Sequence, residues 1–266
     1  MSVGGVSFAA LPSAGRLDGA LALRMRPGVG QKLLLLHGFT DTGDSYGLIA
    51  PHLPNPLWVP DLPGHGVSPP LPRMTLEALA DSLVPVLQTE GPMRVVGHSM
   101  GALVALILAA RLPDLVAGLV LISGALRPEG PEMVGLAAQI AALPDPLAPD
   151  DPFFAEWHRG VRPVPEAFLD SLAQSAAAMR RCDWLELIAA LRAADLTGVA
   201  GRVKCPALLI AGDLDPIFPP AHARALAAAL PQARLQLMAG HGHNPHWESP
   251  ALVAALIGGK TEKAPR

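Results

Sequence analysis

A serine lies at the junction of two apolar runs in the segment VVGHSMGALVAL, residues 95–106. Gly97 and Gly101 stand two positions before and two positions after Ser99. A chain that turns directly from a strand into a helix has no room for side chains at these two flanking positions, so both must be glycine. The segment therefore predicts a buried strand, a tight turn that holds Ser99 in a strained conformation with its hydroxyl raised, and an apolar helix that runs to Leu112.

Short apolar runs alternate with helix-length segments along most of the chain. This alternation is typical of a mostly parallel sheet whose strands are joined by crossover helices. The runs that predict parallel strands are 32–36, 57–60, 94–96, 119–122, 207–211 and 235–238, and the runs 6–10 and 17–24 predict an antiparallel opening pair. We therefore expect an α/β fold with a mostly parallel central sheet flanked by helices.

The strand signal is interrupted between residues 122 and 207, where helical patterns replace it. Asp151 before a proline is a helix-start signal, and so is Asp183 with Glu186 three residues later. We expect a helical lid here, inserted into the sheet domain, with helices at 131–143, 152–159, 165–179 and 184–194. The predicted organisation is a first part of the sheet domain at 1–125, the lid at 126–197, a second part at 198–260 and a tail at 261–266.

Composition limits the partners of the chain. Half of the 266 residues are hydrophobic and 16% are charged, as in compact globular proteins. The net charge of −3 and the lack of a basic run argue against nucleic acid and anionic membranes, and the longest apolar run, 102–110, is too short to cross a bilayer. Cys182 and Cys205 lack metal-binding or disulfide spacing, which favours buried free thiols. We expect a cytoplasmic protein that binds a small molecule.

The raised serine needs partners if it is to react. A serine hydroxyl becomes a nucleophile only when a base removes its proton, and that base is held in one tautomer by an acid. Asp213 and Asp215 follow the apolar run 207–211, and His241, His243 and His246 follow the run 235–238. Two later strand ends thus supply candidate acids and candidate bases.

Five segments resemble the α/β-hydrolase superfamily and stand in the order that the family shows. They are LLLLHGF, PDLPGHGVS, GHSMG, LLIAGDLDPIFPP and GHGHNPHWESP. The resemblance covers nearly the whole chain except the lid. It implies Ser99 as nucleophile, Asp215 as acid and His243 as base, with an oxyanion hole formed by the backbone N–H groups of Phe39 and Met100.

Some assignments within these motifs have rivals. Asp213 competes with Asp215, which is favoured because Pro216 restricts its backbone and because the family spacing selects it. His241 and His246 compete with His243. His98, beside the serine, is interpreted as a packed, hydrogen-bonded side chain, and His65 in the second motif is interpreted as structural.

The identity of the nucleophile narrows the set of candidate reactions. Haloalkane dehalogenases and epoxide hydrolases of this superfamily place an aspartate where this chain has Ser99, so both are disfavoured. We expect a serine hydrolase, without cofactor or metal, that cleaves a small to medium carboxylic ester or lactone through an acyl-enzyme. The alternatives are a C–C bond hydrolase of ring-cleavage products, whose histidine is usually followed by tryptophan rather than Asn244, a perhydrolase, and a non-catalytic ligand-binding protein.

Aromatic and basic residues of the lid are candidates for contact with a substrate. Core packing is the favoured role for any single one of these aromatic residues, but together they are the candidate pocket walls: Phe153, Phe154, Trp157, Trp184 and, outside the lid, Phe218. The lid arginines Arg159, Arg162, Arg180 and Arg181 either bind an acidic substrate or form solvated helix faces.

Overall fold

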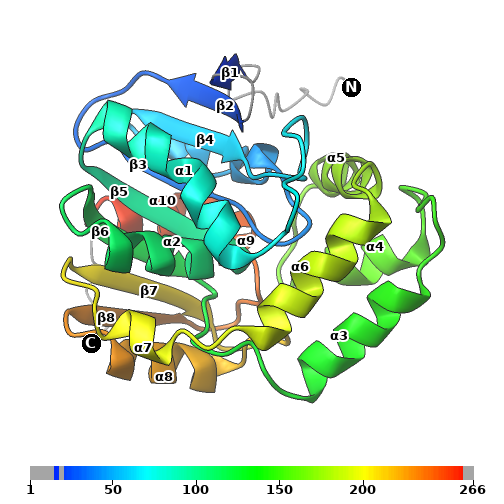
Figure 1. Ribbon diagram of the computed structural model, residues 1–266. Coiled ribbons are helices and arrows are strands. Elements are labelled where there is room, and N and C mark those ends of the chain that lie inside the picture. The colour runs from blue at the N-terminus through cyan, green and yellow to red at the C-terminus, as the bar shows by residue number, and fades with distance from the viewer. Residues whose placement is uncertain (1–14, 18–20, 260–266) are drawn as a thin grey trace, which may run out of the picture.

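The computed structural model describes residues 15–17 and 21–259, which form an eight-stranded sheet with helices around it (Figure 1). The strand order is β1-β2-β4-β3-β5-β6-β7-β8. Strands β3 to β8 run parallel, whereas β2 pairs antiparallel with both β1 and β4. The bounds are β1 Gly15–Leu17, β2 Leu21–Arg26, β3 Leu33–Leu36, β4 Leu57–Asp61, β5 Met93–His98, β6 Val116–Ile122, β7 Ala207–Gly212 and β8 Ala233–Met238. The predicted α/β class with a mostly parallel sheet is confirmed.

The antiparallel edge differs in detail from the expectation. The predicted single strand at 17–24 is wrong, because β1 and β2 share this stretch and Leu17 faces Leu21 across the pair. Apolar alternation reads the same whether a strand continues or reverses, so the pattern did not locate the reversal. The other predicted opening strand, 6–10, lies outside the described residues.

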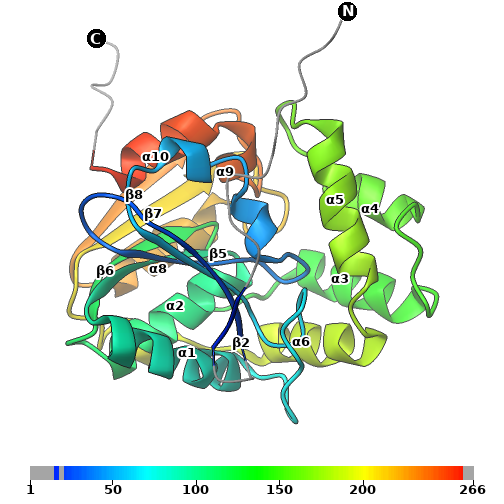
Figure 2. The ribbon, with the colours of Figure 1, turned by 90° about the horizontal axis from the view of Figure 1, so that it is seen from above.

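Helices cover both faces of the sheet (Figure 2). One face packs against α1 (Leu76–Glu90), α2 (Met100–Arg111) and α8 (Pro220–Ala229), and the other against α10 (Pro250–Ile257) and the 3₁₀ helices η1 (Gly43–Tyr46) and η2 (Ala50–His52). Strand β3 is buried on both sides: Leu34 and Leu36 belong to the first core, and Leu33 and Leu35 to the second. Burial on both faces explains why the run is apolar throughout.

A helical segment, residues 126–197, follows β6 in the chain and precedes β7. It lies at one side of the sheet (Figure 1). It contains α3 (Pro131–Ala142), α4 (Pro152–Trp157), α5 (Glu166–Ala177) and α6 (Arg181–Ala193), and α7 (Thr197–Ala200) follows at its end. The N–H of Leu196 donates to the carbonyl of Leu126 over 2.9 Å, so the segment leaves and rejoins the sheet at one point. The segment is therefore an insertion between two neighbouring strands, and its role as a lid stays a prediction.

The two helix-start signals of this segment have different outcomes. The carboxylate of Asp151 caps α4 by accepting from the N–H of Phe153 over 2.9 Å, as its helix-start signal indicates. Helix α6, however, begins at Arg181, and the carboxylate of Asp183 pairs with Arg180 instead of capping a helix. The two cysteines are free, but neither is buried as predicted: Cys182 is exposed on the outer side of α6, and Cys205 is half-buried.

Candidate active site

Ser99 is the single residue between β5 and α2, and its backbone is strained, with φ 51° and ψ −116°. The glycines on either side are required by contacts. A Cβ added to Gly97 would lie 2.2 Å from the carbonyl oxygen of Gly101, and a Cβ added to Gly101 would lie 2.2 Å from the carbonyl oxygen of Leu36. The tight turn predicted from the two glycines is therefore present, and it places Ser99 at the end of the central strand.

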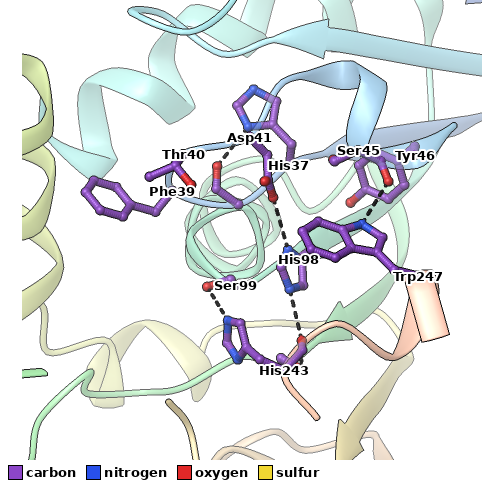
Figure 3. Close-up of polar contacts among 12 residues, drawn as sticks. His37, Phe39, Thr40, Asp41, Ser45, Tyr46, His98, Ser99, His243 and Trp247 are labelled. Atoms are coloured by element: carbon purple, nitrogen blue, oxygen red, sulfur yellow. Dashed lines mark hydrogen bonds and ion pairs between the residues drawn. The ribbon is translucent and has the colours of Figure 1, made fainter. Parts of the chain in front are cut away.

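His243 faces Ser99 from the loop after β8 (Figure 3). Its Nε2 lies 3.0 Å from the Oγ of Ser99, within hydrogen-bond distance. Its Nδ1 lies 2.8 Å and 3.0 Å from the two carboxylate oxygens of Asp215, which follows β7. The folded chain thus brings together the three residues that the resemblance selected, from the ends of three parallel strands.

Asp215 is buried and fully hydrogen-bonded. Its carboxylate accepts from the backbone N–H groups of Ile217 and Phe218, each over 2.9 Å. Burial raises the pKa of this carboxyl, but His243 and the two N–H donors outweigh it, so the pKa of Asp215 lies below its usual value. The rival Asp213 bonds the N–H of Gly240 over 2.7 Å at the surface. Only Asp215 therefore reaches the imidazole.

The two rival histidines point elsewhere. The ring of His241 bonds the hydroxyl of Ser249 over 2.7 Å and the carbonyl of Ala239 over 2.9 Å. His246 is fully buried and packs on His98 with ring centroids 4.4 Å apart. Of the three histidines after β8, His243 is the one that bonds the serine.

The two candidate oxyanion donors belong to residues near this serine, because Phe39 lines the same small pocket as Ser99 and Met100 follows Ser99 in the chain. Phe39 follows β3, and its carbonyl is held by the ring of His65 at 2.6 Å, in keeping with a structural role for that histidine. Met100 is the first residue of α2, where the helix dipole favours negative charge. In the described part of the chain, no backbone acceptor pairs with the N–H of Phe39 or of Met100. The oxyanion hole formed by these two N–H groups stays a prediction.

A second line of polar contacts, from Asp41 through His98 to the backbone of His243, runs beside Ser99 (Figure 3). The Nε2 of His98 donates to the carbonyl of His243 over 3.1 Å, and the hydroxyl of Ser123 donates to the same carbonyl over 2.8 Å. The carboxylate of Asp41 lies 3.7 Å from the other ring nitrogen of His98, which is longer than a hydrogen bond. This line fixes the backbone of the histidine loop. Sequence reasoning missed Asp41 and Ser123, although Asp41 could have been noticed as a carboxylate beside the LLLLHGF motif.

Two cavities adjoin the site. An inner pocket of about 20 Å³ borders Ser99 and is lined in part by Asp41 and His158. An outer cavity of about 610 Å³ opens between α3, α4 and the loop after β7. Trp157 lines both cavities and Phe153 lines the outer one.

The remaining aromatic candidates lie outside the lining of these two cavities. Phe154 stacks on His158 with centroids 5.5 Å apart, and Phe218 packs edge-on against His243 at 5.4 Å. Trp184 packs against Phe39 at 5.6 Å and borders a separate apolar cavity between α3 and α6. These three side chains therefore support the walls from behind.

Residues 33–256 match the alpha/beta hydrolase family over most of the chain. The chain belongs to this family. It is 35% identical over 242 residues to a pimeloyl-(acyl-carrier protein) methyl ester esterase of Aromatoleum aromaticum, covering 85% of this chain and 96% of that protein. It is also 40% identical over 129 residues to lipase LipV of Mycobacterium tuberculosis, covering 47% of this chain and 49% of the lipase.

Solved structures share the fold of this alpha/beta hydrolase. A thermophilic esterase from Thermogutta terrifontis superposes with a TM-score of 0.73 and 26% sequence identity, over 94% of this chain and 96% of the esterase. Among the described residues, no helix has the length and hydropathy needed to cross a membrane.

Proposed function

We propose that this alpha/beta hydrolase cleaves a small to medium carboxylic ester or lactone with Ser99 as nucleophile, His243 as general base and acid, and Asp215 as the orienting acid. The observation that carries the proposal is the continuous line of hydrogen bonds from Ser99 Oγ through His243 to the buried carboxylate of Asp215. The esterase and lipase names of its relatives support the same bond type.

The proposed reaction proceeds in two halves. His243 Nε2 takes the proton of Ser99 as Oγ attacks the ester carbonyl, and the resulting imidazolium is stabilised by Asp215. The negative carbonyl oxygen is bound by the N–H groups of Phe39 and Met100. His243 then gives its proton to the leaving alcohol, and a water molecule activated by the same imidazole hydrolyses the acyl-enzyme.

The test combines a covalent probe with turnover. A fluorophosphonate is expected to add one phosphonyl group to the protein, located on Ser99 by peptide mass spectrometry, and a panel of 4-nitrophenyl esters and lactones is expected to be hydrolysed. Ser99→Ala should abolish labelling and lower kcat by roughly a millionfold. When residues act as a unit, the loss of one costs about as much activity as the loss of all of them. The circular dichroism of this variant should stay unchanged, since only one hydroxyl is removed.

The same experiment separates the alternatives. A folded protein that neither labels nor turns over any ester would be the non-catalytic binding protein. Labelling at Ser99 without ester hydrolysis would favour C–C bond cleavage, and retention of most activity in Ser99→Ala would end the serine mechanism.

A further inference from the structure

Two residues other than glycine have a positive φ in the part of the chain that the structure describes, and both are serines. One is Ser99, at φ 51°, and the other is Ser123, at φ 49°, directly after β6. This backbone region is strained for a residue with a Cβ, whereas glycine enters it readily. A strained residue that persists beside a candidate active site points to a role for its side chain.

Ser123 lies between the strands that lead to the candidate nucleophile and the candidate acid. Its N–H donates to the carbonyl of Ile210 in β7 over 2.8 Å. The carbonyl of the residue before it, Ile122, accepts from the N–H of Ser99 over 2.9 Å. The backbone around Ser123 is thus bonded to Ser99 on one side and, on the other, to the strand after which Asp215 follows.

The hydroxyl of Ser123 is directed at the backbone of His243. It donates to the carbonyl of His243 over 2.8 Å, and Ser123 is 1% exposed, so bulk water does not compete for this bond. The Nε2 of His98, at the end of the neighbouring strand β5, donates to the same carbonyl over 3.1 Å. Two donors from adjacent strands fix both the position and the direction of the carbonyl, whereas one donor alone would leave it free to swing.

The position of this carbonyl affects the reacting atoms, because the imidazole belongs to the same residue. The Nε2 of His243 lies 3.0 Å from the Oγ of Ser99, and its Nδ1 lies 2.8 Å from a carboxylate oxygen of Asp215. A catalytic side chain is effective only when the groups around it hold it within about 0.5 Å of the productive geometry. Loss of one of the two bonds to the carbonyl is therefore expected to let the imidazole move out of line.

We propose, on the basis of the proposed function, that Ser123 is a positioning residue for ester cleavage, and that its hydroxyl fixes the imidazole of His243 by holding the carbonyl of that residue. Ser123 lines neither the inner pocket nor the outer cavity, so it acts through His243 and not through the substrate. A glycine would relieve the backbone strain but would carry no hydroxyl. The need for the hydroxyl explains why a strained serine stands here.

Three substitutions separate the hydroxyl from the strain. Ser123→Gly removes the hydroxyl and relieves the strain, Ser123→Ala removes the hydroxyl and keeps the strain, and Ser123→Thr keeps both. The substrate is the 4-nitrophenyl ester that the wild type hydrolyses fastest. In the glycine and alanine variants alike, kcat should fall by roughly 10- to 100-fold, the effect of a small misplacement of a catalytic group. Ser123→Thr should retain most of kcat, and KM should change little in all three variants.

Stability is expected to follow the strain instead. The urea midpoint should be higher for Ser123→Gly than for Ser123→Ala, because only glycine adopts a φ of 49° without strain. The matched control is Ser68→Ala, which removes another buried serine hydroxyl. The bonds of that hydroxyl lead to Ala22 in β2 and Asp61 in β4, so the control should lower the midpoint and leave kcat unchanged.

A spectroscopic readout reports on the imidazole directly. In the wild type, the N–H of His243 that bonds Asp215 should give a far-downfield proton NMR resonance, identified by its loss in Asp215→Asn. This resonance should broaden in Ser123→Gly and in Ser123→Ala, because a less firmly held ring exchanges its proton with water faster. It should stay sharp in Ser68→Ala, whatever the change in stability.

The outcomes are distinguishable. Unchanged kcat in the glycine and alanine variants, an equal loss of kcat in a folded Ser123→Thr, or a loss that follows the urea midpoint would overturn this inference while leaving a Ser99-dependent esterase. If Ser123→Thr does not fold, equal kcat losses in the glycine and alanine variants at different urea midpoints would support it. Absence of both probe labelling and ester turnover in the wild type would overturn the proposed function together with it.

Discussion

Helices α2 and α3 have twelve residues each, yet they stand in opposite surroundings. Ten residues of α2 are buried, and the helix packs between the sheet and α1. In α3 only Met133 and Ile140 are buried, and the helix borders the outer cavity. Because interiors are close-packed and little deformable, α2 holds Ser99 rigidly, whereas α3 can shift at small cost.

The difference in burial between α2 and α3 suggests separate roles for the sheet, which holds the proposed catalytic residues, and for the helical segment, which lines the outer cavity. Ser99, His243 and Asp215 all lie at strand ends of the sheet, where each side chain has a bonded partner. The helical segment 126–197 supplies His158 and most of the outer-cavity wall. Changes in the sheet are therefore expected to affect rate and folding, and changes in the segment are expected to affect which substrate is used.

After the loss of the serine itself, the largest effect is expected from the acid at the sheet end. Asp215→Asn keeps the shape but leaves the imidazole of His243 in the wrong tautomer, so kcat should fall by roughly 10⁴. The matched control, Asp213→Asn, removes only a surface bond to Gly240 and should cost little activity. Steady-state kinetics with circular dichroism of both variants measures this. The reverse ranking in folded proteins would move the acid to Asp213.

The sheet and the serine turn were predictable from sequence for a physical reason. Inner parallel strands such as β3 are buried on both faces, so they are written as unbroken apolar runs. The turn needs glycine at two positions because a Cβ at either one would lie 2.2 Å from a backbone oxygen. Helix α6 was misplaced because Asp183 and Glu186 look like a capping pair but bond Arg180 and the N–H of Met74 instead. Such partners are distant in sequence, as Met74 is from Glu186, or compete locally, as Arg180 does, and a spacing rule cannot rank them.

Two glycine-to-alanine substitutions, one in each helix, test whether α2 is packed more tightly than α3. Gly101→Ala places a Cβ 2.2 Å from a backbone oxygen of β3, which cannot move away, and should destabilise the protein by at least about 4 kcal/mol. Gly135→Ala in α3 meets nothing within 4 Å and should stabilise by about 0.5–1 kcal/mol through helix propensity. Urea unfolding of both variants measures the difference. Similar effects for the two variants would mean that α2 is no more rigid than α3.

The stability of the fold is expected to decrease in acid because of His37, which follows β3. Burial, followed by repulsion from His65, lowers the pKa of His37 from 6.5 to about 3. The folded state thus excludes a proton that the unfolded chain binds, so the contribution of His37 is fully present above pH 6.5 and declines as the pH falls toward 3. The slope for this one group approaches about 1.4 kcal/mol per pH unit.

Urea titrations between pH 7.5 and 5 can isolate this histidine. His37→Asn should be less stable at pH 7.5, because the ring nitrogen that accepts from the N–H of Leu62 is lost. Its unfolding free energy should nevertheless fall less steeply with acid than that of the wild type. An identical slope in the two proteins would assign the proton uptake to other groups.

The functional site was only partly predictable for a different reason. The candidate nucleophile, acid and base follow strand ends that the sequence marks, but the strand ends alone left rivals open. The family resemblance selected Ser99, Asp215 and His243 among them. Asp41 and His158 come from a loop and from the end of a short helix, and their meeting in the inner pocket depends on how the helical segment lies against the sheet. No periodicity or motif in the chain encodes that contact, so His158 looked like any isolated histidine.

The smallest expected effect comes from two side-chain helix caps, one in each region. Thr75 caps α1 by accepting from the N–H of Ala78 over 3.1 Å, and Asp151 caps α4 by accepting from Phe153. Each cap is worth about 1 kcal/mol. Thr75→Ala should lower the global unfolding free energy by that amount, because α1 packs against α2 and opens only with the whole protein. Asp151→Ala should instead raise hydrogen exchange at the backbone N–H of His158 about fivefold, because α4 opens locally, and leave the urea midpoint nearly unchanged. Equal shifts of the urea midpoint in the two variants would show that the helical segment unfolds together with the sheet, and the proposed division between rigid chemistry and adaptable selectivity would then be wrong.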